Sequence, residues 1–358
     1  MRTLMPRLYI HLQSIEENAR RILERCSKYG VEVVGVTKVS LGDPKIAQTM
    51  KDAGIRIIGE SRIDNIVRLR KEGIDGPFMM IRIPQKDDLP KTLDLCEYAL
   101  VSELKTIEWM DEIAHEMGKS ISVIYMVDVG DLREGAWYKD AVEEIAKAVK
   151  MAKKIQVVGV GTNLGCYGGV LPSERNLGIL VQIRDIVEKK SSCELPIVSG
   201  GNTAALKLLE EGKLPFGVNQ YRIGEAIFLG TDVTNNRQIQ WLRQDAIVLE
   251  AQIIELKTKP SFPEGETGQD AFGRKPAFVD KGIRRRAILA LGEQDILSTG
   301  LRPLDNGAEV IHASSDHTIV DVSDVERRIE VGDTMRFTLS YGALLRAMTC
   351  PHVEKIYV

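Results

Sequence analysis

The stretch VVGVTK, residues 33–38, is a short run of mostly β-branched residues that ends in a lysine. Its composition and length are typical of a strand buried on both faces of a parallel sheet. An ammonium group at the end of such a strand is costly to desolvate, so the pKa of Lys38 is expected to fall and its nitrogen to become nucleophilic. Such a lysine can form a Schiff base with a carbonyl compound, although a strand-end lysine can also simply extend its side chain to solvent.

Strand-like runs recur along the first part of the chain, separated by amphipathic segments such as residues 144–154. The predicted strands are residues 33–38, 56–59, 78–83, 98–102, 122–129, 157–163, 196–199 and 221–229. Eight strands joined by crossover helices predict a (β/α)8 TIM-type barrel. A doubly wound open sheet is the competing interpretation, but it normally has fewer strands and a different glycine fingerprint.

The pattern changes after Gly230. Short β-rich runs, such as DAIVLEAQIIEL (245–256) and HTIVDV (317–322), then alternate with turns of Gly, Pro and Asp. Residues 260–275 are polar and glycine-rich, which predicts a long loop. We therefore expect a barrel over residues 1–234 and a mostly β C-terminal domain over residues 235–358, against which the first few residues of the chain can pack.

The composition restricts the class of protein. At 358 residues the chain exceeds one ordinary domain, and a hydrophobic content of 44% can support a substantial core. A formal net charge of -3 argues against a nucleic-acid or anionic-membrane partner. No apolar stretch could cross a bilayer, and the first residues lack the apolar core of a signal peptide. The 5 cysteines have no metal-type spacing, so we expect a cytoplasmic protein without a metal site.

In a barrel of this kind, residues after the carboxyl ends of the strands share one mouth. Several side chains suited to chemistry follow predicted strands: Lys38, Glu60, Ser61, Asp131, Arg133, Asn163 and the segment SGGNT at 199–203. Two glycines in SGGNT permit close backbone approach, and Asn202 and Thr203 offer donors ahead of a helical stretch. An ordinary N-capped turn would look the same. Together with a nucleophilic lysine, however, the segment indicates a bound phosphorylated aldehyde, pyridoxal 5'-phosphate.

These motifs resemble those of the fold-type III pyridoxal-phosphate enzymes of the alanine racemase superfamily, most closely the ornithine racemase branch. The resemblance covers nearly the whole chain, through the segments VTK, IIGESR, MVDVGDLREG, SGGNT, RIGEAIFLG and LSYG. It implies an amino-acid racemase that interconverts L and D forms of ornithine, lysine or a broader set of substrates. Two bases on opposite faces of the α-carbon would exchange its proton.

The resemblance also assigns residues to the cofactor. Lys38 would hold the cofactor, Arg133 would lie near its phenolate, and Thr203 would donate to its phosphate. The other cofactor-binding residues would be Asn163, Ser199, Asn202, Arg222, Glu225 and Tyr341. Arg222 would face the pyridine nitrogen, and because an arginine cannot accept the ring proton, racemisation is favoured over decarboxylation or transamination. The alternative role of Arg222 is an ion pair with Glu225.

The chain departs from the family pattern at several positions. Gly42 stands where the racemases carry a tyrosine, and Asn163 where they carry a histidine. Glu293 stands at the position of the tyrosine that acts as the second base, and ASSDH, residues 313–317, replaces the substrate loop. The last two departures concern the substrate and the proton that returns to it.

Lys38 is the predicted first base. The candidates for the second base are Glu293, Asp316 and His317, the last because its ordinary pKa lies near neutrality. Arg133, Ser315 and Asp316 are predicted to bind the substrate, with Asp316 recognising a cationic side chain. Each of the three candidate bases could equally be an ordinary loop, turn or strand-end residue.

By analogy with the family, residues 292–295 and 313–317 would complete the active site of a partner subunit in a head-to-tail homodimer. Three other functions stay open at this point: a decarboxylase of the same fold, a non-catalytic carrier of pyridoxal phosphate, and a cofactor-free Schiff-base aldolase. Arg222 disfavours the first, and the second domain disfavours the carrier. The LSYG segment, residues 339–342, would go unexplained in the aldolase.

Overall fold

The computed structural model describes residues 6–358, which fall into two compact units. One unit is Ile15–Arg243, and the other combines the described residues up to Ser14 with Gln244–Val358. The division lies beyond the predicted boundary between residues 234 and 235. The hairpin of β11 (Thr231–Asp232) and β12 (Arg237–Gln238) therefore belongs to the first unit.

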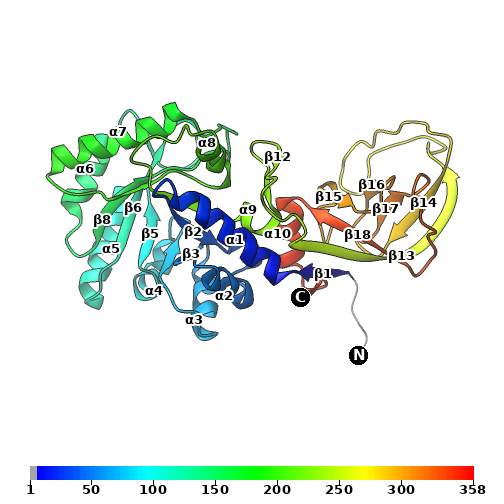
Figure 1. The fold of residues 1–358 in the computed structure, drawn as a ribbon, viewed down its shortest axis with the longest axis horizontal. Coiled ribbons are helices and arrows are strands. Elements are labelled where there is room, and N and C mark those ends of the chain that lie inside the picture. Colours follow the sequence, from blue (N-terminus) through cyan, green and yellow to red (C-terminus); the bar gives the residue numbers. More distant parts are fainter. Residues whose placement is uncertain (1–5) are drawn as a thin grey trace. The chain divides into compact units, whose positions relative to one another are not determined.

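The unit Ile15–Arg243 is built on a closed parallel barrel (Figure 1). Its strands, in order around the ring, are β2 (Glu32–Val36), β3 (Ile57–Glu60), β4 (Phe78–Met80), β5 (Tyr98–Val101), β6 (Ser122–Asp128), β8 (Gln156–Gly161), β9 (Ile197–Ser199) and β10 (Gln220–Ile223). Pairing of β5 with β6 and of β10 with β2 closes the ring. The short strand β7 (Ala136–Trp137) pairs with β6 outside the ring. The predicted (β/α)8 barrel is confirmed.

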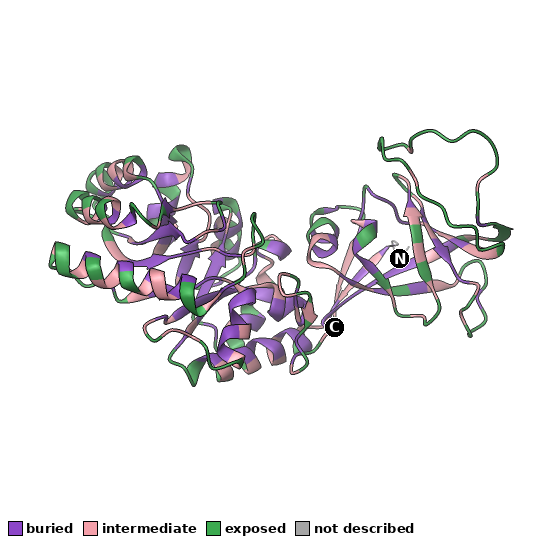
Figure 2. Cartoon of the chain, turned by 90° about the horizontal axis from the view of Figure 1, so that it is seen from above, coloured by how far each residue is buried: buried purple, intermediate pink, exposed green. Residues whose placement is uncertain are grey.

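Helices alternate with these strands along the chain. They are α1 (Leu12–Ser27), α2 (Pro44–Asp52), α3 (Ile63–Lys71), α4 (Leu89–Leu95), α5 (Leu104–Met117), α6 (Ala141–Met151), α7 (Glu174–Ser191), α8 (Leu206–Glu210) and α9 (Glu225–Leu229). Their amphipathic pattern explains their place: α6 buries Ala141, Ile145 and Ala148, which recur at helical spacing. Figure 2 shows the same pattern: the barrel strands are mostly buried, whereas the helices around them are buried on one face and exposed on the other.

The predicted strand at residues 221–229 is wrong in its second half. β10 ends at Ile223, and the chain turns at Gly224 into α9. Gly224 lies so close to the neighbouring strand β2 that a Cβ atom there would be 3.0 Å from the carbonyl oxygen of Val36. The backbone N–H of Ala226 then donates to Thr203 Oγ1 at 3.3 Å. Tertiary contacts thus decide where this apolar run stops being a strand.

Apolar side chains from neighbouring strands fill the barrel interior. Val34, Ile57, Met79, Leu100 and Ile124 form one buried cluster across β2 to β6. On the other side of β2, Arg222 of β10 pairs in register with Val34. The barrel therefore carries a buried guanidinium at the level of its apolar core.

The second unit is mostly β, as the sequence predicts. Its sheet order is β15 (Leu301–Pro303), β18 (Thr334–Leu339), β13 (Ile247–Pro260), β14 (Ile283–Leu289), β17 (Thr318–Asp321) and β16 (Glu309–Ala313). β1 (Arg7–Ile10) pairs with β13 and with β19 (Glu354–Tyr357), and α10 (Tyr341–Thr349) follows β18. Residues 261–281, between β13 and β14, form a mostly exposed loop (Figure 2).

Candidate active site

Lys38 stands just after β2, as the first residue of the 3-10 turn η1 (Lys38–Ser40). Its side chain is exposed, unlike the enclosed lysine that the strand pattern predicts. Desolvation by the surrounding protein atoms nevertheless lowers the pKa of its ammonium group. Arg133 and Arg222 lower this pKa further, whereas Cys166 and Glu60 oppose the shift. These four side chains are therefore within electrostatic reach of Lys38.

Glu60, the last residue of β3, is fully buried. Its carboxylate accepts hydrogen bonds from Thr37 Oγ1 at 2.9 Å, from Asn65 Nδ2 at 3.0 Å and from the backbone N–H of Ser61 at 2.9 Å. Burial raises the pKa of Glu60, and these hydrogen bonds counteract the rise. With its oxygens engaged in this way, Glu60 ties the residue before Lys38 to the end of β3.

Two aspartates shape the loop after β6. Asp128 accepts hydrogen bonds from the backbone N–H groups of Gly130 at 2.8 Å and Leu132 at 3.2 Å, where Leu132 has a left-handed φ of 57°. Asp131 is buried and reaches the loop after β8. There it accepts from four backbone N–H groups, those of Gly165 (3.1 Å), Cys166 (3.0 Å), Tyr167 (2.8 Å) and Val170 (3.0 Å). One carboxylate therefore fixes two loops of the barrel mouth together.

Arg133 and Asn163 come from these two loops and meet at Glu134. Glu134 Oε1 accepts a hydrogen bond from Arg133 Nη1 at 2.8 Å and another from Asn163 Nδ2. Glu134 is not among the site residues predicted from the sequence. Its position, directly after a predicted site arginine in a loop that follows a barrel strand, is the one signal that could have found it.

Arg222 is buried, and its direct partners are neutral. Its guanidinium donates to Ser199 Oγ, to the carbonyl oxygen of Thr162 at 2.7 Å and to Asn163 Oδ1 at 2.7 Å. Desolvation lowers the pKa of Arg222 to about 10. Such a group stays charged at neutral pH and presents hydrogen-bond donors in a fixed plane.

Glu225 does not serve as the counter-ion of Arg222, and the alternative interpretation of Arg222 is wrong. The Glu225 carboxylate instead accepts hydrogen bonds from Thr231 Oγ1 at 2.7 Å and from the backbone N–H of Val233 at 2.8 Å. Desolvation raises the pKa of Glu225 to about 7. The carboxyl group thus closes the turn after α9.

The SGGNT segment forms a tight turn after β9. Gly201 has a φ of 115°, a conformation that favours glycine. Asn202 caps the 3-10 turn η3 (Thr203–Ala205), and its Oδ1 accepts from the backbone N–H of Ala204 at 3.0 Å. Thr203 is buried and contacts the start of α9 through Ala226. The segment therefore joins two turns at the carboxyl ends of β9 and β10.

Cys166 is a second site residue that is not predicted from the sequence. It is exposed, and its Sγ lies 3.7 Å from Asn202 Nδ2. Desolvation raises the pKa of its thiol, which disfavours a thiolate. No chemical pattern in the sequence distinguishes it from the other cysteines.

Glu293, a predicted second base, is a buried, ion-paired residue of the β unit. Ser298 Oγ donates to its Oε1 at 2.5 Å, and Arg346 Nη1 donates to its Oε2 at 3.1 Å. Arg274 Nη1 lies 3.5 Å from Oε1. Two guanidinium groups stabilise the anion and compete for the lone pairs that a base would need.

The two segments predicted to complete a partner's site lie side by side within the β unit. The backbone N–H of Glu293 donates to the carbonyl oxygen of Ser314 at 2.9 Å, and that of Gln294 to the carbonyl oxygen of Ser315 at 2.9 Å. Gly292 lies tightly against the same segment, since a Cβ atom there would be 2.3 Å from the backbone nitrogen of Asp316.

The end of this segment exposes a carboxylate and an imidazole. His317 Nδ1 lies 3.0 Å from Asp316 Oδ1, which also accepts a hydrogen bond from Ser315 Oγ at 3.2 Å. The Ser315 hydrogen bond, together with His317, lowers the pKa of Asp316. In the same unit, Tyr341 is the first residue of α10, directly after the N-cap Ser340.

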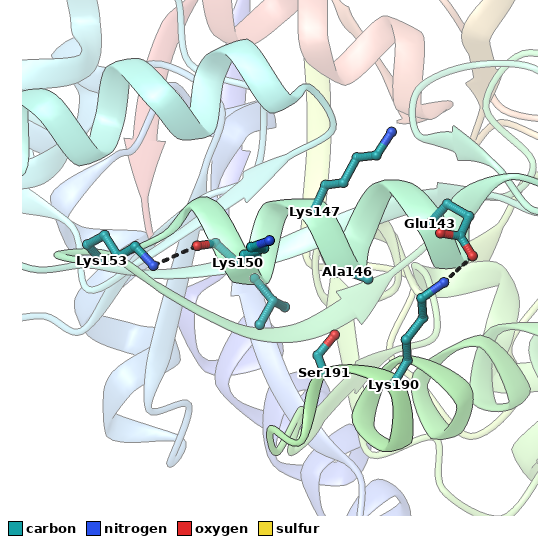
Figure 3. Close-up of a pocket in the computed structure, with 8 residues that line it drawn as sticks. Glu143, Ala146, Lys147, Lys150, Lys153, Lys190 and Ser191 are labelled. Atoms are coloured by element: carbon teal, nitrogen blue, oxygen red, sulfur yellow. Dashed lines mark hydrogen bonds and ion pairs between the residues drawn. The ribbon is translucent and has the colours of Figure 1, made fainter.

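A basic hollow lies between α6 and α7 on the outside of the barrel (Figure 3). Its lining residues include Glu143, Lys147, Lys150, Lys153 and Lys190. Lys190 pairs with Glu143, and Lys153 Nζ donates to the carbonyl oxygen of Lys150 at 2.8 Å. None of the residues gathered at the strand ends lines this hollow, so it is not the candidate active site.

Comparison with known proteins agrees with this geometry. Residues 10–232 match the family model for the N-terminal domain of alanine racemase. The chain is 53% identical to the lysine racemase of Thermotoga maritima, over 98% of each chain. It is 38% identical to the ornithine racemase of Acetoanaerobium sticklandii, over 98% of this chain and 99% of the relative. Its fold is similar to that of an alanine racemase from Bartonella henselae with covalently bound pyridoxal phosphate (TM-score 0.75, 16% identity, 99% of each chain).

The fold and these similarities define a pyridoxal-phosphate-dependent amino-acid racemase. The chain belongs to the alanine racemase family. The predicted family, cofactor and class of reaction are therefore confirmed. Among residues 6–358, no helix has both the length and the apolar character needed to cross a membrane.

The residues at the strand ends fit the cofactor. Lys38 offers an accessible amine of lowered pKa, and Arg222 offers a guanidinium whose hydrogen-bond partners are neutral. The turn at Asn202 and Thr203 supplies polar groups suited to a phosphate. When bound, pyridoxal phosphate supplies an electron sink for negative charge that develops on the α-carbon of an amino acid.

Proposed function

We propose that this chain interconverts the L and D forms of amino acids with a cationic side chain, lysine and ornithine. The observation that carries this proposal is the similarity to a lysine racemase at 53% identity and to an ornithine racemase at 38%, both over nearly the full chain. Asp316 supports it, because an exposed carboxylate with a lowered pKa can pair with an ammonium group.

In this proposal the barrel residues bind and orient the cofactor. Lys38 holds it covalently and, once released, acts as the base on one face of the α-carbon. Ser199, Asn202, Thr203 and Glu225 hold or support its phosphate end. Arg133 and Asn163 border the ring, and Arg133 also binds the substrate. Arg222 faces the ring nitrogen and, because it cannot take up the ring proton, leaves that nitrogen unprotonated.

The proposal also assigns the base on the opposite face of the α-carbon, the second base, to His317. His317 is favoured over Glu293, because two arginines and a serine engage the carboxylate of Glu293. The imidazole of His317 lies 3.0 Å from Asp316, and a histidine side chain is a common general base. Ser315 and Asp316 then bind the substrate rather than its α-proton.

We also infer a head-to-tail homodimer in which residues 292–295 and 313–317 of one subunit complete the site of the other. Direct hydrogen bonds join these two segments, which supports this inference. Segments that are joined in this way would contact a partner subunit together, as one surface. We place the enzyme in the cytoplasm. The free state of all five cysteines supports a reducing compartment.

Incubation with each common L-amino acid, followed by chiral analysis, tests the substrate class. We expect D-lysine and D-ornithine to form fastest, with Lys38→Ala losing both the activity and the visible absorption of the bound cofactor. Lys105→Ala, at an exposed helix position, is the control and keeps both. Faster conversion of alanine than of lysine would contradict the substrate assignment. Release of carbon dioxide would indicate a decarboxylase, and binding of the cofactor without any turnover would indicate a carrier.

Solvent deuterium exchange at the α-carbon tests the second base. With His317→Gln, exchange from one enantiomer should fall at least roughly tenfold more than from the other, because each base serves one face. Glu293→Gln should slow both directions alike, because it removes the negative charge that pairs with Arg346 and Arg274. One-sided loss in Glu293→Gln would instead make Glu293 the base.

A further inference from the structure

Arg222 poses an electrostatic problem inside the barrel. A buried charge is costly unless an opposite charge or a full set of hydrogen bonds compensates it. The three groups that accept hydrogen bonds from this guanidinium are a hydroxyl, a backbone carbonyl and an amide, all of them neutral. The compensating negative charge must therefore act from farther away.

Glu134 is the anion that reaches Arg222 through the fewest intermediates. Asn163 uses both ends of its amide: Oδ1 accepts from Arg222 Nη2 at 2.7 Å, and Nδ2 donates to Glu134 Oε1. The carboxylate polarises the amide in the direction that strengthens its acceptor end. The negative charge of Glu134 also acts on Arg222 directly and stabilises its charged form.

A second path of hydrogen bonds connects Arg222 to a more distant carboxylate, that of Glu32. Ser199 accepts from Arg222 and donates to Gln220 Oε1 at 2.9 Å. Gln220 Nε2 in turn donates to Glu32 Oε2 at 3.2 Å. Two neutral groups separate Arg222 from Glu32, whose other oxygen lies 3.8 Å from Arg56. Glu32 is thus farther from Arg222 along the chain of hydrogen bonds than Glu134 is.

We propose that Glu134 is a positioning residue, which holds Arg222 in place through Asn163 and supplies the negative charge that its buried guanidinium lacks. Glu134 also pairs with Arg133 at 2.8 Å, and it has no role in proton transfer. The consequence for the cofactor rests on the proposed function, in which Arg222 faces the ring nitrogen. The effect on Arg222 itself does not depend on that function and can be measured without cofactor.

Hydrogen exchange of the Arg222 guanidinium tests the relay in the full-length protein without cofactor. Isotope-labelled arginine makes the signal visible by NMR, and Arg222→Lys assigns it. We compare Glu134→Leu, Asn163→Leu and the double variant, with Glu134→Gln as a nearly isosteric variant that keeps an acceptor for Asn163. Glu143→Leu, which removes a carboxylate from the ion pair with Lys190 on α6, is the matched control.

Each single leucine variant should speed exchange at Arg222 at least roughly tenfold. The double variant should exceed the larger single effect by less than about twofold, because both substitutions break one relay. Glu134→Gln should fall between the wild type and Glu134→Leu, and Glu143→Leu should change nothing. Unchanged exchange in Glu134→Leu, or multiplied effects in the double variant, would overturn the proposal.

Affinity for pyridoxal phosphate gives a second readout. Titration of the same proteins should show a dissociation constant at least roughly threefold weaker in Glu134→Leu than in the wild type, because a poorly held arginine orients the ring less well. Faster exchange together with unchanged affinity would keep the relay and contradict the role of Arg222 at the ring. Unchanged exchange would refute the relay while leaving the proposed racemase intact.

Discussion

Asp131 Oδ2 accepts a hydrogen bond from the backbone N–H of Tyr167 at 2.8 Å, so a carboxylate after β6 holds the loop after β8. Three further N–H groups of that loop donate to the same side chain. Arg133 and Asn163 lie in the two loops that this carboxylate joins. Asp131 therefore holds together the loops after β6 and β8, which carry Arg133 and Asn163.

Asp131→Ala should impair both stability and activity. The substitution leaves four backbone donors without their acceptor, which should lower the free energy of unfolding by roughly 1–3 kcal/mol. Racemase activity should fall at least roughly tenfold, because the loops that carry Arg133 and Asn163 lose their common anchor. Chemical denaturation and turnover of the same preparations measure the two effects.

Asp111→Ala is the matched control for Asp131→Ala. Asp111 Oδ1 accepts from the backbone N–H groups of Lys153, Lys154 and Ile155, ahead of β8 rather than after it. Its loss should cost similar stability with little loss of activity. If both variants lose activity in proportion to stability, Asp131 has no special role at the mouth.

The lowered pKa of Lys38 predicts how attachment of the cofactor depends on pH. Only the neutral amine attacks an aldehyde, so borohydride trapping of pyridoxal phosphate should reach its half-maximal rate below pH 10.5, the ordinary lysine pKa. Arg133→Leu removes a positive charge that lowers this pKa, so the midpoint should move upward. Arg20→Leu, on the outer surface of α1, should leave the midpoint unchanged. A downward shift in Arg133→Leu would contradict the assignment.

Glu225 predicts a pH dependence of stability. Its pKa is about 7 in the folded protein, against 4.5 for an ordinary glutamate in water, so the folded state holds the proton more tightly. Stability from this group is thus fully present below pH 4.5 and is lost as pH rises through 7. Glu225→Gln should therefore stabilise the unloaded protein by roughly 1–3 kcal/mol at about pH 8, with little change at about pH 4.5. Equal shifts at both pH values, measured by urea denaturation, would refute this.

Gly42 predicts a local steric effect. Its φ is 60°, and a Cβ atom there would lie 2.9 Å from the Cβ of Asn65. Gly42→Ala should therefore cost roughly 2–3 kcal/mol, whereas Gly30→Ala, with a φ of 68° and open space around it, should cost only about 1 kcal/mol. Equal costs, measured by chemical denaturation, would mean that the backbone conformation alone matters. Any larger side chain at this position would meet the same contact with Asn65.

Much of the fold follows from local sequence pattern. The strand at Glu32–Val36 and the lysine after it are evident because β-branched residues with this spacing suit a buried parallel strand. Alternation of such strands with amphipathic helices predicts the barrel, and the barrel places residues after strand ends at one mouth. The family motifs are equally local, because each spans a single strand and the turn after it.

Tertiary structure decided what local pattern does not encode. Arg222 and Asn163 are separated by 59 positions in the sequence, and their hydrogen bond depends on the register of β10 against its neighbours. The chain alone marks Glu293 as a free carboxylate, yet folding pairs it with Arg346 and Ser298. The sequence determined which strands form and where the lysine stands, because those depend on neighbouring residues. Which charges compensate one another was decided only by folding, since partners distant in the chain must first be brought within hydrogen-bond distance.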